Sequence, residues 1–279
     1  ALFLDDTLTY SCALFERPDA SLRDASIAKY DRIAALLALG PDDHLVEIGT
    51  GWGGFAVHAA RRYGCRVTTT TISAEQARLA RQRVADLGLA DRVTVLERDY
   101  RDLDGAYDKL VSIEMVEAVG HEYFGTFFAR CAALLKPSGR AAIQAITIPD
   151  ERYDAARREV DFIKRYVFPG GCLPSLAVLR QAAAATDLRL ERVDEIGLHY
   201  PETLRRWRGN FTRNRDTVAA LGFDERFRRI WEFYFCYCEG AFLERAIGDV
   251  QLALAKPAAA PLGPVAAPPA PPAVVGAAA

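Results

Sequence analysis

The segment His44–Gly54 constrains the fold of this chain more than any other segment. It reads as a buried strand, a glycine-rich turn and the beginning of a helix near Gly53. Glycines let the backbone adopt positive φ and let a ligand approach the main chain closely. The N-terminus of a helix leaves amide N–H groups free to bind polar atoms of a ligand. We therefore expect one end of this strand to hold a nucleotide-like molecule.

The rest of the chain alternates between predicted strands and helices. The strand patterns cover residues 44–49, 65–72, 92–98, 107–113, 140–148, 188–197 and 249–255, and helix patterns cover 21–39, 53–63 and 74–88. Such alternation predicts right-handed crossovers and a parallel sheet with helices on both faces. Residues 150–187 and 201–246 interrupt the alternation as helical insertions. Because ligands of such sheets bind at the carboxyl ends of the strands, we expect the insertions to roof the site.

Composition bounds the class of protein. The chain has 279 residues, 51% of them hydrophobic, which is enough for one large domain that we assign to residues 1–256. A net charge of −2 argues against nucleic-acid binding. No apolar run approaches the roughly 18 residues of a membrane-spanning helix. The six cysteines have no metal-ligand spacing with the four histidines, so we expect a reduced, cytoplasmic protein without a metal.

The two ends of the chain differ from the rest. Residues 257–279 are alanine- and proline-rich, with almost no polar side chains and no periodicity. We expect this tail to be disordered or loosely attached. The first residue is alanine rather than methionine, so we expect the start to be trimmed or missing.

Two cofactors compete for the glycine turn. Gly49, Gly51 and Gly54 match the dinucleotide fingerprint, which also requires an acidic residue about 20 positions further on to hold the ribose. The next strand instead ends in threonine and serine, with no carboxylate before Glu75. An acidic residue, Glu47, stands two positions before the first glycine, and the run that it opens resembles motif I of S-adenosylmethionine-dependent methyltransferases. We therefore favour S-adenosylmethionine over a nicotinamide dinucleotide.

Longer motifs resemble the cyclopropane fatty acid and mycolic acid cyclopropane synthase family over nearly all of residues 5–256. These motifs are Tyr10-Ser11-Cys12, Thr71–Gln76, Asp99–Asp102, Val111–Gly120, Phe168–Ser175 and Tyr200–Leu204. The resemblance implies an α/β protein with a Rossmann-like class I methyltransferase fold, a seven-stranded mostly parallel sheet and helical lid insertions. It also implies an enzyme that adds a one-carbon unit from S-adenosylmethionine across a cis double bond of a lipid acyl chain. Some members carry an N-terminal lipid-binding domain that this sequence does not include, so the chain is either of the shorter type or cut.

The resemblance also assigns a cofactor site. Glycines would pack against the amino-acid part of the cofactor, neutral polar groups would lie near its ribose and adenine, and the segment near residue 10 would close over it. The residues so assigned are Tyr10, Ser11, Glu47, Gly49, Gly51, Gly53, Thr71, Ile72, Ser73, Gln76, Asp99, Tyr100 and Ile113. From the residues alone, Thr71 reads equally as part of an ordinary β-branched strand and Gln76 as a solvated helix residue.

The same resemblance implies a demanding reaction. Methyl transfer from a sulfonium to an alkene leaves a carbocation on the acyl chain, so the site must exclude water, stabilise positive charge and then remove a proton. Family members use a bound bicarbonate ion as the proton acceptor. The positions that match its partners are Cys12, Glu117, Ile146 through its backbone, and Tyr200, with Gln144 in the same shell. From the residues alone, Glu117 is also consistent with an acid at a helix start, and the residue types of Cys12 and Tyr200 by themselves favour a core cysteine and a packed tyrosine.

Three positions depart from the family pattern. Gln144 replaces the usual histidine, and a glutamine carries no charge and relays no proton as imidazole does. Ala118 also replaces a common histidine. Glu114 stands where glycine is frequent, three residues before Glu117. We hypothesise that deprotonation differs here, so that a methylene- or methyl-branched chain forms instead of a cyclopropane ring.

The predicted partner is an unsaturated phospholipid or fatty acyl chain. Residues 201–230 hold eight arginines against four acids, with aromatic residues between them. That pattern suits transient docking on a membrane surface of anionic lipid and predicts a cytoplasmic, peripherally membrane-associated protein. The alternative is amphipathic helices with inward aromatics and solvated arginines. The aromatic-rich segment 231–243 either lines the acyl pocket or belongs to the core. The sequence is also compatible with a homodimer.

Two rival functions remain. A small-molecule N-, O- or C-methyltransferase shares the cofactor loop but lacks Tyr10-Ser11-Cys12 and the Phe168–Ser175 turn. A lipid- or adenosyl-binding protein without catalysis is compatible with the glutamine at 144. The chain has no G-x-S-x-G elbow, no zinc-ligand cluster and no P-loop lysine, which argues against hydrolases, zinc enzymes and P-loop nucleotidases.

Overall fold

The computed structural model describes residues 2–272, whose strands form one seven-stranded sheet in the order β3-β2-β1-β4-β5-β7-β6. The strands are β1 His44–Ile48, β2 Arg66–Thr71, β3 Val93–Glu97, β4 Tyr107–Ile113, β5 Leu135–Thr147, β6 Arg189–Glu195 and β7 Gly248–Ala255. The first five strands run parallel, and β7 runs antiparallel to both β5 and β6. The seven predicted strands and the mostly parallel sheet are therefore confirmed.

The beginning of β5 differs from the prediction. The predicted strand covers residues 140–148, whereas β5 begins at Leu135 and includes Pro137 and Gly139. The pairing with β4 explains the difference, because Tyr107 pairs with Leu135 and Lys109 with Arg140, and the register shifts between them. The proline and glycine lie inside this irregularity, where a strand tolerates both residues.

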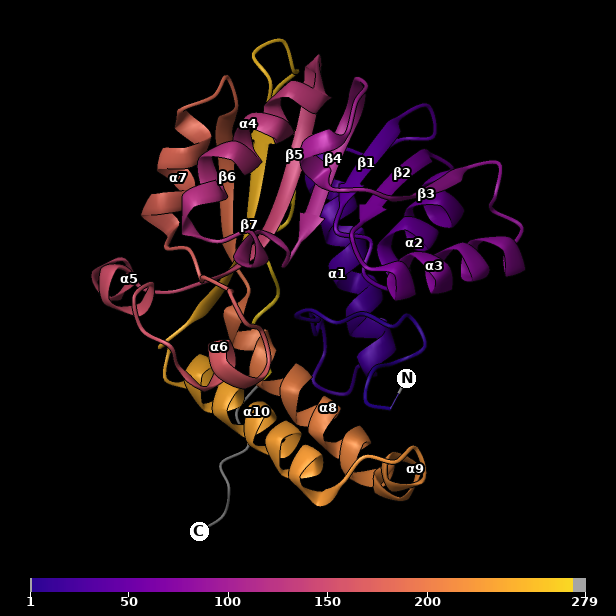
Figure 1. Cartoon of the computed structure of the whole chain (residues 1–279). Coiled ribbons are helices and arrows are strands. Elements are labelled where there is room, and N and C mark those ends of the chain that lie inside the picture. The colour runs from indigo at the N-terminus through magenta and orange to yellow at the C-terminus, as the bar shows by residue number, and fades with distance from the viewer. Residues whose placement is uncertain (1, 273–279) are drawn as a thin grey trace.

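Helices cover both faces of the sheet (Figure 1). One face packs against α1 Leu22–Leu37, α2 Gly54–Tyr63 and α3 Ala74–Asp86, and the other against α4 Phe124–Leu134 and α7 Leu176–Ala184. Side chains alternate along each strand, so Leu45 joins the first core and Val46 the second. Ser21 caps α1, its hydroxyl accepting from the Asp24 amide at 3.1 Å.

The remaining helices gather beyond the carboxyl ends of the parallel strands (Figure 1). They are α5 Asp150–Ala156, α6 Phe162–Tyr166, α8 Tyr200–Arg213, α9 Arg215–Ala220 and α10 Glu225–Leu243, and short 3-10 turns are η1 Tyr100–Asp102, η2 Val116–Ala118, η3 His121–Tyr123 and η4 Gly197–His199. Within the predicted insertion 150–187, α7 instead packs on α4 and β6. The segment 201–246 is helical, as predicted, and holds the short α9 between the longer α8 and α10.

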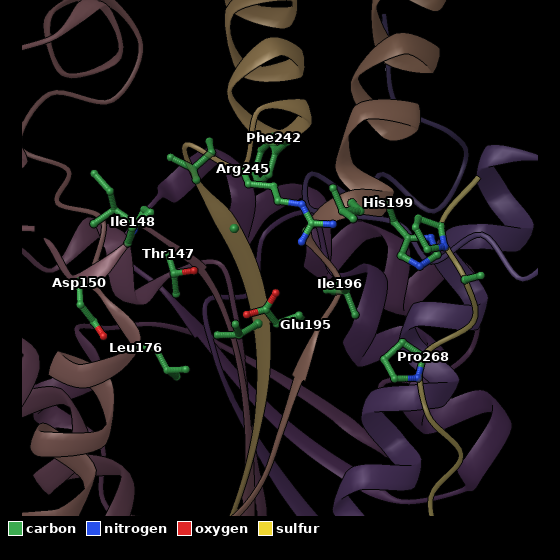
Figure 2. A pocket seen from close by; sticks show the side chains of 18 of the residues that line it. Thr147, Ile148, Asp150, Leu176, Glu195, Ile196, His199, Phe242, Arg245 and Pro268 are labelled. Atoms are coloured by element: carbon green, nitrogen blue, oxygen red, sulfur yellow. The ribbon is translucent and has the colours of Figure 1, made fainter. Parts of the chain in front are cut away.

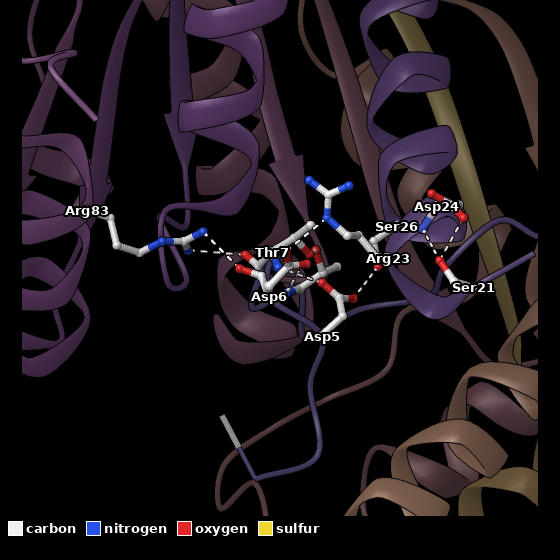
Figure 3. A network of polar contacts seen from close by, with 9 residues as sticks. Asp5, Asp6, Thr7, Ser21, Arg23, Asp24, Ser26 and Arg83 are labelled. Carbon is white, nitrogen blue, oxygen red and sulfur yellow. Dashed lines mark hydrogen bonds and ion pairs between the residues drawn. The ribbon is translucent and has the colours of Figure 1, made fainter. Parts of the chain in front are cut away.

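The N-terminal segment 2–20 lies between the sheet and these outer helices. Cys12, Leu14 and Phe15 share a buried cluster with Trp207 and Phe235 of α8 and α10. A polar network fixes the first residues of the segment (Figure 3). In it, Arg83 of α3 donates to the Thr7 carbonyl at 3.1 Å and to the Trp52 carbonyl at 2.6 Å. One guanidinium therefore joins the N-terminal segment to the glycine turn.

The tail contacts the sheet layer through its main chain. Residues 257–272 contain no helix or strand, and their carbonyl groups accept hydrogen bonds from side chains of the domain. Arg32 donates to Ala266 at 2.7 Å, Arg192 to Val265 at 2.6 Å, and Arg140 to Ala260. The predicted disorder stays a prediction for this segment, and residues 273–279 lie outside the described residues.

Substitution of Gly54, the first residue of α2, tests how closely the N-terminal segment packs on this helix. A Cβ atom at Gly54 would lie 2.4 Å from the Tyr30 hydroxyl and 2.8 Å from the Thr7 carbonyl oxygen. We expect Gly54→Ala to lower the free energy of unfolding by about 1–3 kcal/mol because the backbone at Thr7 must move. Urea denaturation measures the change.

The matched control is Gly125→Ala, also in the first turn of a helix. A Cβ there would meet nothing within 4 Å, so this variant should be as stable as the parent or slightly more stable. Equal stability of the Gly54 and Gly125 variants would contradict the close packing.

Candidate active site

The glycine turn after β1 is open on the side where a ligand was expected. Gly49, Gly51 and Gly53 have φ of 102°, 50° and 81°, values that favour glycine. A Cβ at Gly49 would lie 3.0 Å from Met115 Cγ, whereas at Gly51 it would meet nothing within 4 Å. The amides of Gly49 and Thr50 both donate to the Thr70 carbonyl at 3.0 Å. The turn is therefore anchored to β2 and leaves room at Gly51.

Glu47 lies beneath this turn. It is buried, and its Oε2 accepts a hydrogen bond of 2.6 Å from the Thr69 hydroxyl, which also lies 2.7 Å from the Thr50 hydroxyl. Burial raises the pKa of Glu47 to about 8. The carboxyl group thus supports the turn from inside, and its predicted part in cofactor binding stays a prediction.

The predicted adenosine-side residues meet where β2 ends and α3 begins. The Thr71 hydroxyl donates to Gln76 Oε1 at 2.8 Å, and the Ser73 hydroxyl caps α3 by accepting from the Gln76 amide at 3.3 Å. The side chain of Ile72 projects outward and is 79% exposed. Three neutral polar groups and one free apolar side chain therefore share this strand end, which suits a sugar and a flat ring.

The pair Asp99-Tyr100 lies beyond β3. The Asp99 carboxylate caps η1 through the Arg101 amide at 2.9 Å and pairs with the Arg101 guanidinium at 2.7 Å, which lowers the pKa of Asp99. The Tyr100 ring packs edge-on against Phe127 at 5.7 Å. In this structure Asp99 therefore has local partners, and ligand contacts of both residues stay predictions.

The segment Tyr10-Ser11-Cys12 crosses the carboxyl ends of β4 and β5. The Tyr10 hydroxyl donates to the Tyr234 hydroxyl of α10 at 3.0 Å. Ser11 accepts a 2.6 Å hydrogen bond from Nζ of Lys29, a fully buried lysine of α1. The backbone amide of Cys12 donates to Glu114 Oε1 at 2.8 Å. This motif therefore links the lid, α1 and the strand ends.

Glu114 is the centre of the polar site. It directly follows β4, where Ile113 pairs with Gln144 of β5. Its Oε1 accepts from the Cys12 amide and from Gln144 Nε2, both at 2.8 Å, and its Oε2 accepts from the Tyr200 hydroxyl at 2.7 Å. The backbone at Glu114 has φ of 49°, which costs a non-glycine residue roughly 1–2 kcal/mol. Three residues predicted to hold an ion thus bind a carboxylate of the chain itself.

Glu117 lies one turn further on. Its Oε1 accepts a 2.5 Å hydrogen bond from the Ile146 amide, so these two residues, both predicted to bind bicarbonate, bind each other. Among the described residues, no group donates a hydrogen bond to its buried Oε2. Burial, and then the charge of Glu114, raise the pKa of Glu117 to about 8. Its backbone carbonyl accepts from the Cys172 amide at 2.8 Å, which docks the Phe168–Ser175 turn beside the site.

Gln144 connects the carboxyl groups to the interior of the sheet. Besides Glu114, its Nε2 contacts Asp249 Oδ2 at 3.1 Å, and its Oε1 accepts from Gln251 Nε2 at 3.0 Å. Burial, and then the charge of Glu114, hold the pKa of Asp249 well above its usual range. Gln144 therefore serves as a fixed bridge within a buried network.

An aromatic wall flanks this network. Tyr200 stacks on Phe242 with centroids 4.3 Å apart, and its ring meets Trp207 edge-on at 6.0 Å. The ring centroids of Trp207 and Tyr10 lie 5.3 Å apart, and those of Tyr10 and Phe168 lie 6.2 Å apart. Phe168 is 45% exposed. Aromatic rings thus run without interruption from Glu114 to the surface.

The sequence prediction missed three members of this site. Glu114 was recognised as a departure from the family but was not assigned a role, and Lys29 and Asp249 were not considered. The sequence did contain a signal for Lys29 and Asp249. A lysine on the apolar face of α1 and an aspartate in the apolar strand β7 cost free energy to bury unless they are paired. The identity of the partners required the three-dimensional structure.

A cavity of about 580 Å³ lies between the ends of β5 and β6, the beginning of β7 and the tail (Figure 2). Figure 2 shows Thr147, Glu195, His199, Phe242 and Pro268 around it. The predicted site residues do not line it, although Phe242 also stacks on Tyr200. The cavity is therefore separate from the predicted cofactor site.

The raised pKa of Glu117 predicts a pH-dependent stability. Between the unfolded value of 4.5 and the folded value of about 8, the folded state binds a proton that the unfolded state releases. The contribution of Glu117 to stability is therefore complete below pH 4.5 and is lost as the pH rises to 8, by up to about 1.4 kcal/mol per unit. Glu117→Gln removes this loss, so its stability relative to the parent should increase from pH 5 to 8 in urea denaturation.

The exposed Glu122, changed to Gln, is the matched control for this measurement. The difference in the free energy of unfolding between the Glu122 variant and the parent should not change with pH. A constant difference for the Glu117 variant would contradict the buried, protonated carboxyl group.

Comparison with known proteins agrees with this geometry. A family model described as mycolic acid cyclopropane synthetase matches residues 1–252. The chain is 45% identical over 250 residues to a Mycobacterium tuberculosis protein named tuberculostearic acid methyltransferase, and 37% identical over 250 residues to the cyclopropane-fatty-acyl-phospholipid synthase of Escherichia coli. These alignments cover 87% and 89% of this chain but only 58% and 62% of the relatives' lengths.

A solved structure resembles the fold closely. The crystal structure of a mycolic acid cyclopropane synthase, complexed with SAH and CTAB, superposes with a TM-score of 0.86 at 33% identity. The superposition covers 91% of this chain and 92% of that one. The seven-stranded sheet is that of Rossmann-like class I methyltransferases. Fold, motifs and family model agree, and the chain belongs to the mycolic acid cyclopropane synthetase family.

Proposed function

We propose that this chain transfers a one-carbon unit from S-adenosylmethionine to the cis double bond of an unsaturated lipid acyl chain. The observation that carries the proposal is the continuous aromatic wall from exposed Phe168 through Tyr10 and Trp207 to Tyr200, which ends at a carboxylate. Aromatic faces accommodate both an apolar chain and a positive charge. A small polar acceptor would not need such a wall.

The residues around the glycine turn fit the proposed cofactor. Gly51 has open space where a side chain would stand, and the Thr71–Gln76 cluster offers neutral polar groups for a ribose and adenine. When bound, S-adenosylmethionine supplies an electrophilic methyl group. The protein holds Tyr10 and Cys12 over the neighbouring strand ends, and the buried rings exclude water from a cation on the substrate.

The cation that follows methyl transfer has two outcomes. Loss of a proton from the new methyl group can close a cyclopropane ring. A hydride shift before that loss gives a methylene branch. The ring is the product that the family name favours, and the carboxylate at position 114 together with Gln144 favours the branch as the second candidate.

Membrane docking is the proposed route to the substrate. Among residues 2–272, no helix is both long enough and apolar enough to cross a bilayer. The arginines expected to dock on lipid are in part neutralised, since Arg205 and Arg206 pair with Glu202 at 2.6 and 2.7 Å, and Arg208 lies 3.6 Å from Glu239. We therefore propose that exposed aromatic side chains, rather than these arginines, make the main contact with the membrane.

These side chains form what we call the α6–α10 aromatic face, which consists of Phe162, Tyr166, Phe168, Phe233 and Tyr237. The Phe162 and Phe233 rings lie 4.6 Å apart, and Phe233 and Tyr237 are 51% and 41% exposed. Exposed aromatics gathered on one face suit the interfacial region of a bilayer. Phe168 connects this face to Tyr10 and so to the aromatic wall.

The test of the reaction uses methyl-labelled S-adenosylmethionine and vesicles of a monounsaturated phospholipid. We expect label in the acyl fraction, and none with the saturated phospholipid of equal chain length, because only the alkene accepts the methyl group. Mass spectrometry and NMR of the released acids then identify a ring or a branch. Label on a polar acceptor, or cofactor binding without turnover, would refute the proposal.

The test of docking uses Phe233→Ser. Burying a phenylalanine contributes roughly 1.5–3 kcal/mol, so its loss should weaken binding to anionic phospholipid vesicles about tenfold. Co-sedimentation measures this affinity. The control is Leu87→Ser, which removes an apolar side chain that is 43% exposed at the end of α3; equal loss in both variants would argue against this face.

A further inference from the structure

The donors that would hold a bicarbonate ion are already engaged. The Tyr200 hydroxyl, Gln144 Nε2 and the Cys12 amide donate to Glu114 at 2.7, 2.8 and 2.8 Å. The remaining donor of the expected set, the Ile146 amide, donates to Glu117 at 2.5 Å. Each predicted hydrogen-bond donor to the ion therefore binds a carboxyl group of the protein, and the residues present do not fit a free bicarbonate.

The local charge also disfavours a second anion. Three carboxyl groups, those of Glu114, Glu117 and Asp249, meet at Gln144 and the Ile146 amide. The nearest buried cation is Lys29, which interacts with Glu114 and Asp249 and whose hydrogen bond goes to Ser11. Burial, and then the charge of Glu114, raise the pKa of Glu117 to about 8 and hold the pKa of Asp249 well above its usual range, which favours the protonated form of both carboxyl groups. With three carboxyl groups already beside one buried lysine, an added bicarbonate ion would bring a further negative charge into this cluster without a matching cation.

Glu114 has the properties that a built-in proton acceptor needs. Three donated hydrogen bonds fix its two oxygens and suit an ionised carboxylate. It is not sealed in the core, because its burial is intermediate whereas Gln144 is only 1% exposed. Its backbone is held at a positive φ that favours glycine, with the Glu114 amide donating to the Gln144 carbonyl at 2.8 Å. A glutamate kept in a strained conformation is a frequent mark of a functional site.

We propose that the Glu114 carboxylate accepts the proton released in the reaction, in the place that bicarbonate holds in the family. The inference rests on the proposed function. After methyl transfer the acyl chain carries a cation. A C–H bond of the new methyl group breaks, its electron pair forms the ring bond or the methylene double bond, and the proton passes to Glu114. The carboxylic acid later returns that proton to water, so charge and atoms balance.

The first experiment needs no variant. Lipid labelling by the unaltered protein is measured in carbonate-free buffer under argon and again with millimolar bicarbonate. We expect equal rates. In parallel, the ¹³C line width of labelled bicarbonate is followed as protein with bound S-adenosylhomocysteine is added, and it should not change. A rate that requires bicarbonate, or saturable broadening of the line, overturns the proposal.

Two variants test the residue itself. Glu114→Gln keeps the shape but removes the base, so kcat should fall at least about 100-fold while the Kd for S-adenosylhomocysteine stays within about twofold. Glu114→Gly frees the donors of Cys12, Gln144 and Tyr200, so bicarbonate should restore part of its activity and its ¹³C line should broaden. Glu122→Gln is the control with an exposed carboxylate nearby, and it should behave as the parent.

The outcomes separate the two proposals. Label in the acyl fraction combined with an active, bicarbonate-insensitive Glu114→Gln variant overturns the role of Glu114 and leaves the proposed function in place. An absence of acyl label from the unaltered protein in both buffers overturns the proposed function and this inference with it. Saturable bicarbonate binding to the unaltered protein overturns the inference alone, whatever the activity.

Discussion

The carboxylate of Glu114 joins three parts of the chain that are distant in sequence. It accepts hydrogen bonds from Cys12 of the N-terminal segment, from Gln144 of β5 and from Tyr200 at the start of α8. The N-terminal segment, the sheet and the lid therefore meet at one pair of oxygen atoms. Because an unpaired donor in this setting is costly, the position of each part depends on the others. The site is then complete only when all three are in place.

Charge balance explains why so many polar groups are tolerated next to apolar cores. Lys29 is fully buried, and burial lowers its pKa while the carboxyl groups around it oppose that change. Burial raises the pKa values of Glu117 and Asp249 and so favours their uncharged forms. The network thus brings one buried lysine and three carboxyl groups together beside aromatic rings. Such an environment suits a reaction whose intermediate is a cation.

Periodicity predicted the strands and the helices of the sheet correctly, because alternating burial along β1 and the glycines after it are local properties. The beginning of β5 was predicted wrongly, since Pro137 and Gly139 are turn residues that here lie in a bulge whose register depends on β4. The glycine turn and the strand ends were located from the sequence. The hydrogen-bond partners were not, because Cys12 and Glu114 are 102 residues apart and their contact depends on how the strands align. The positive φ of Glu114 also has no signal in a single sequence.

The tail shows how a segment with little side-chain chemistry can still be held. Three arginines of the domain, of which Arg32 and Arg140 are buried, donate to its carbonyl groups at positions 260, 265 and 266. Proline lacks an amide donor but keeps its carbonyl, so an alanine- and proline-rich chain offers acceptors at every residue. These hydrogen bonds involve the main chain of the tail and not its side chains. The tail should therefore tolerate many substitutions during evolution. The requirement is that its extended path and the arginines that donate to it are retained.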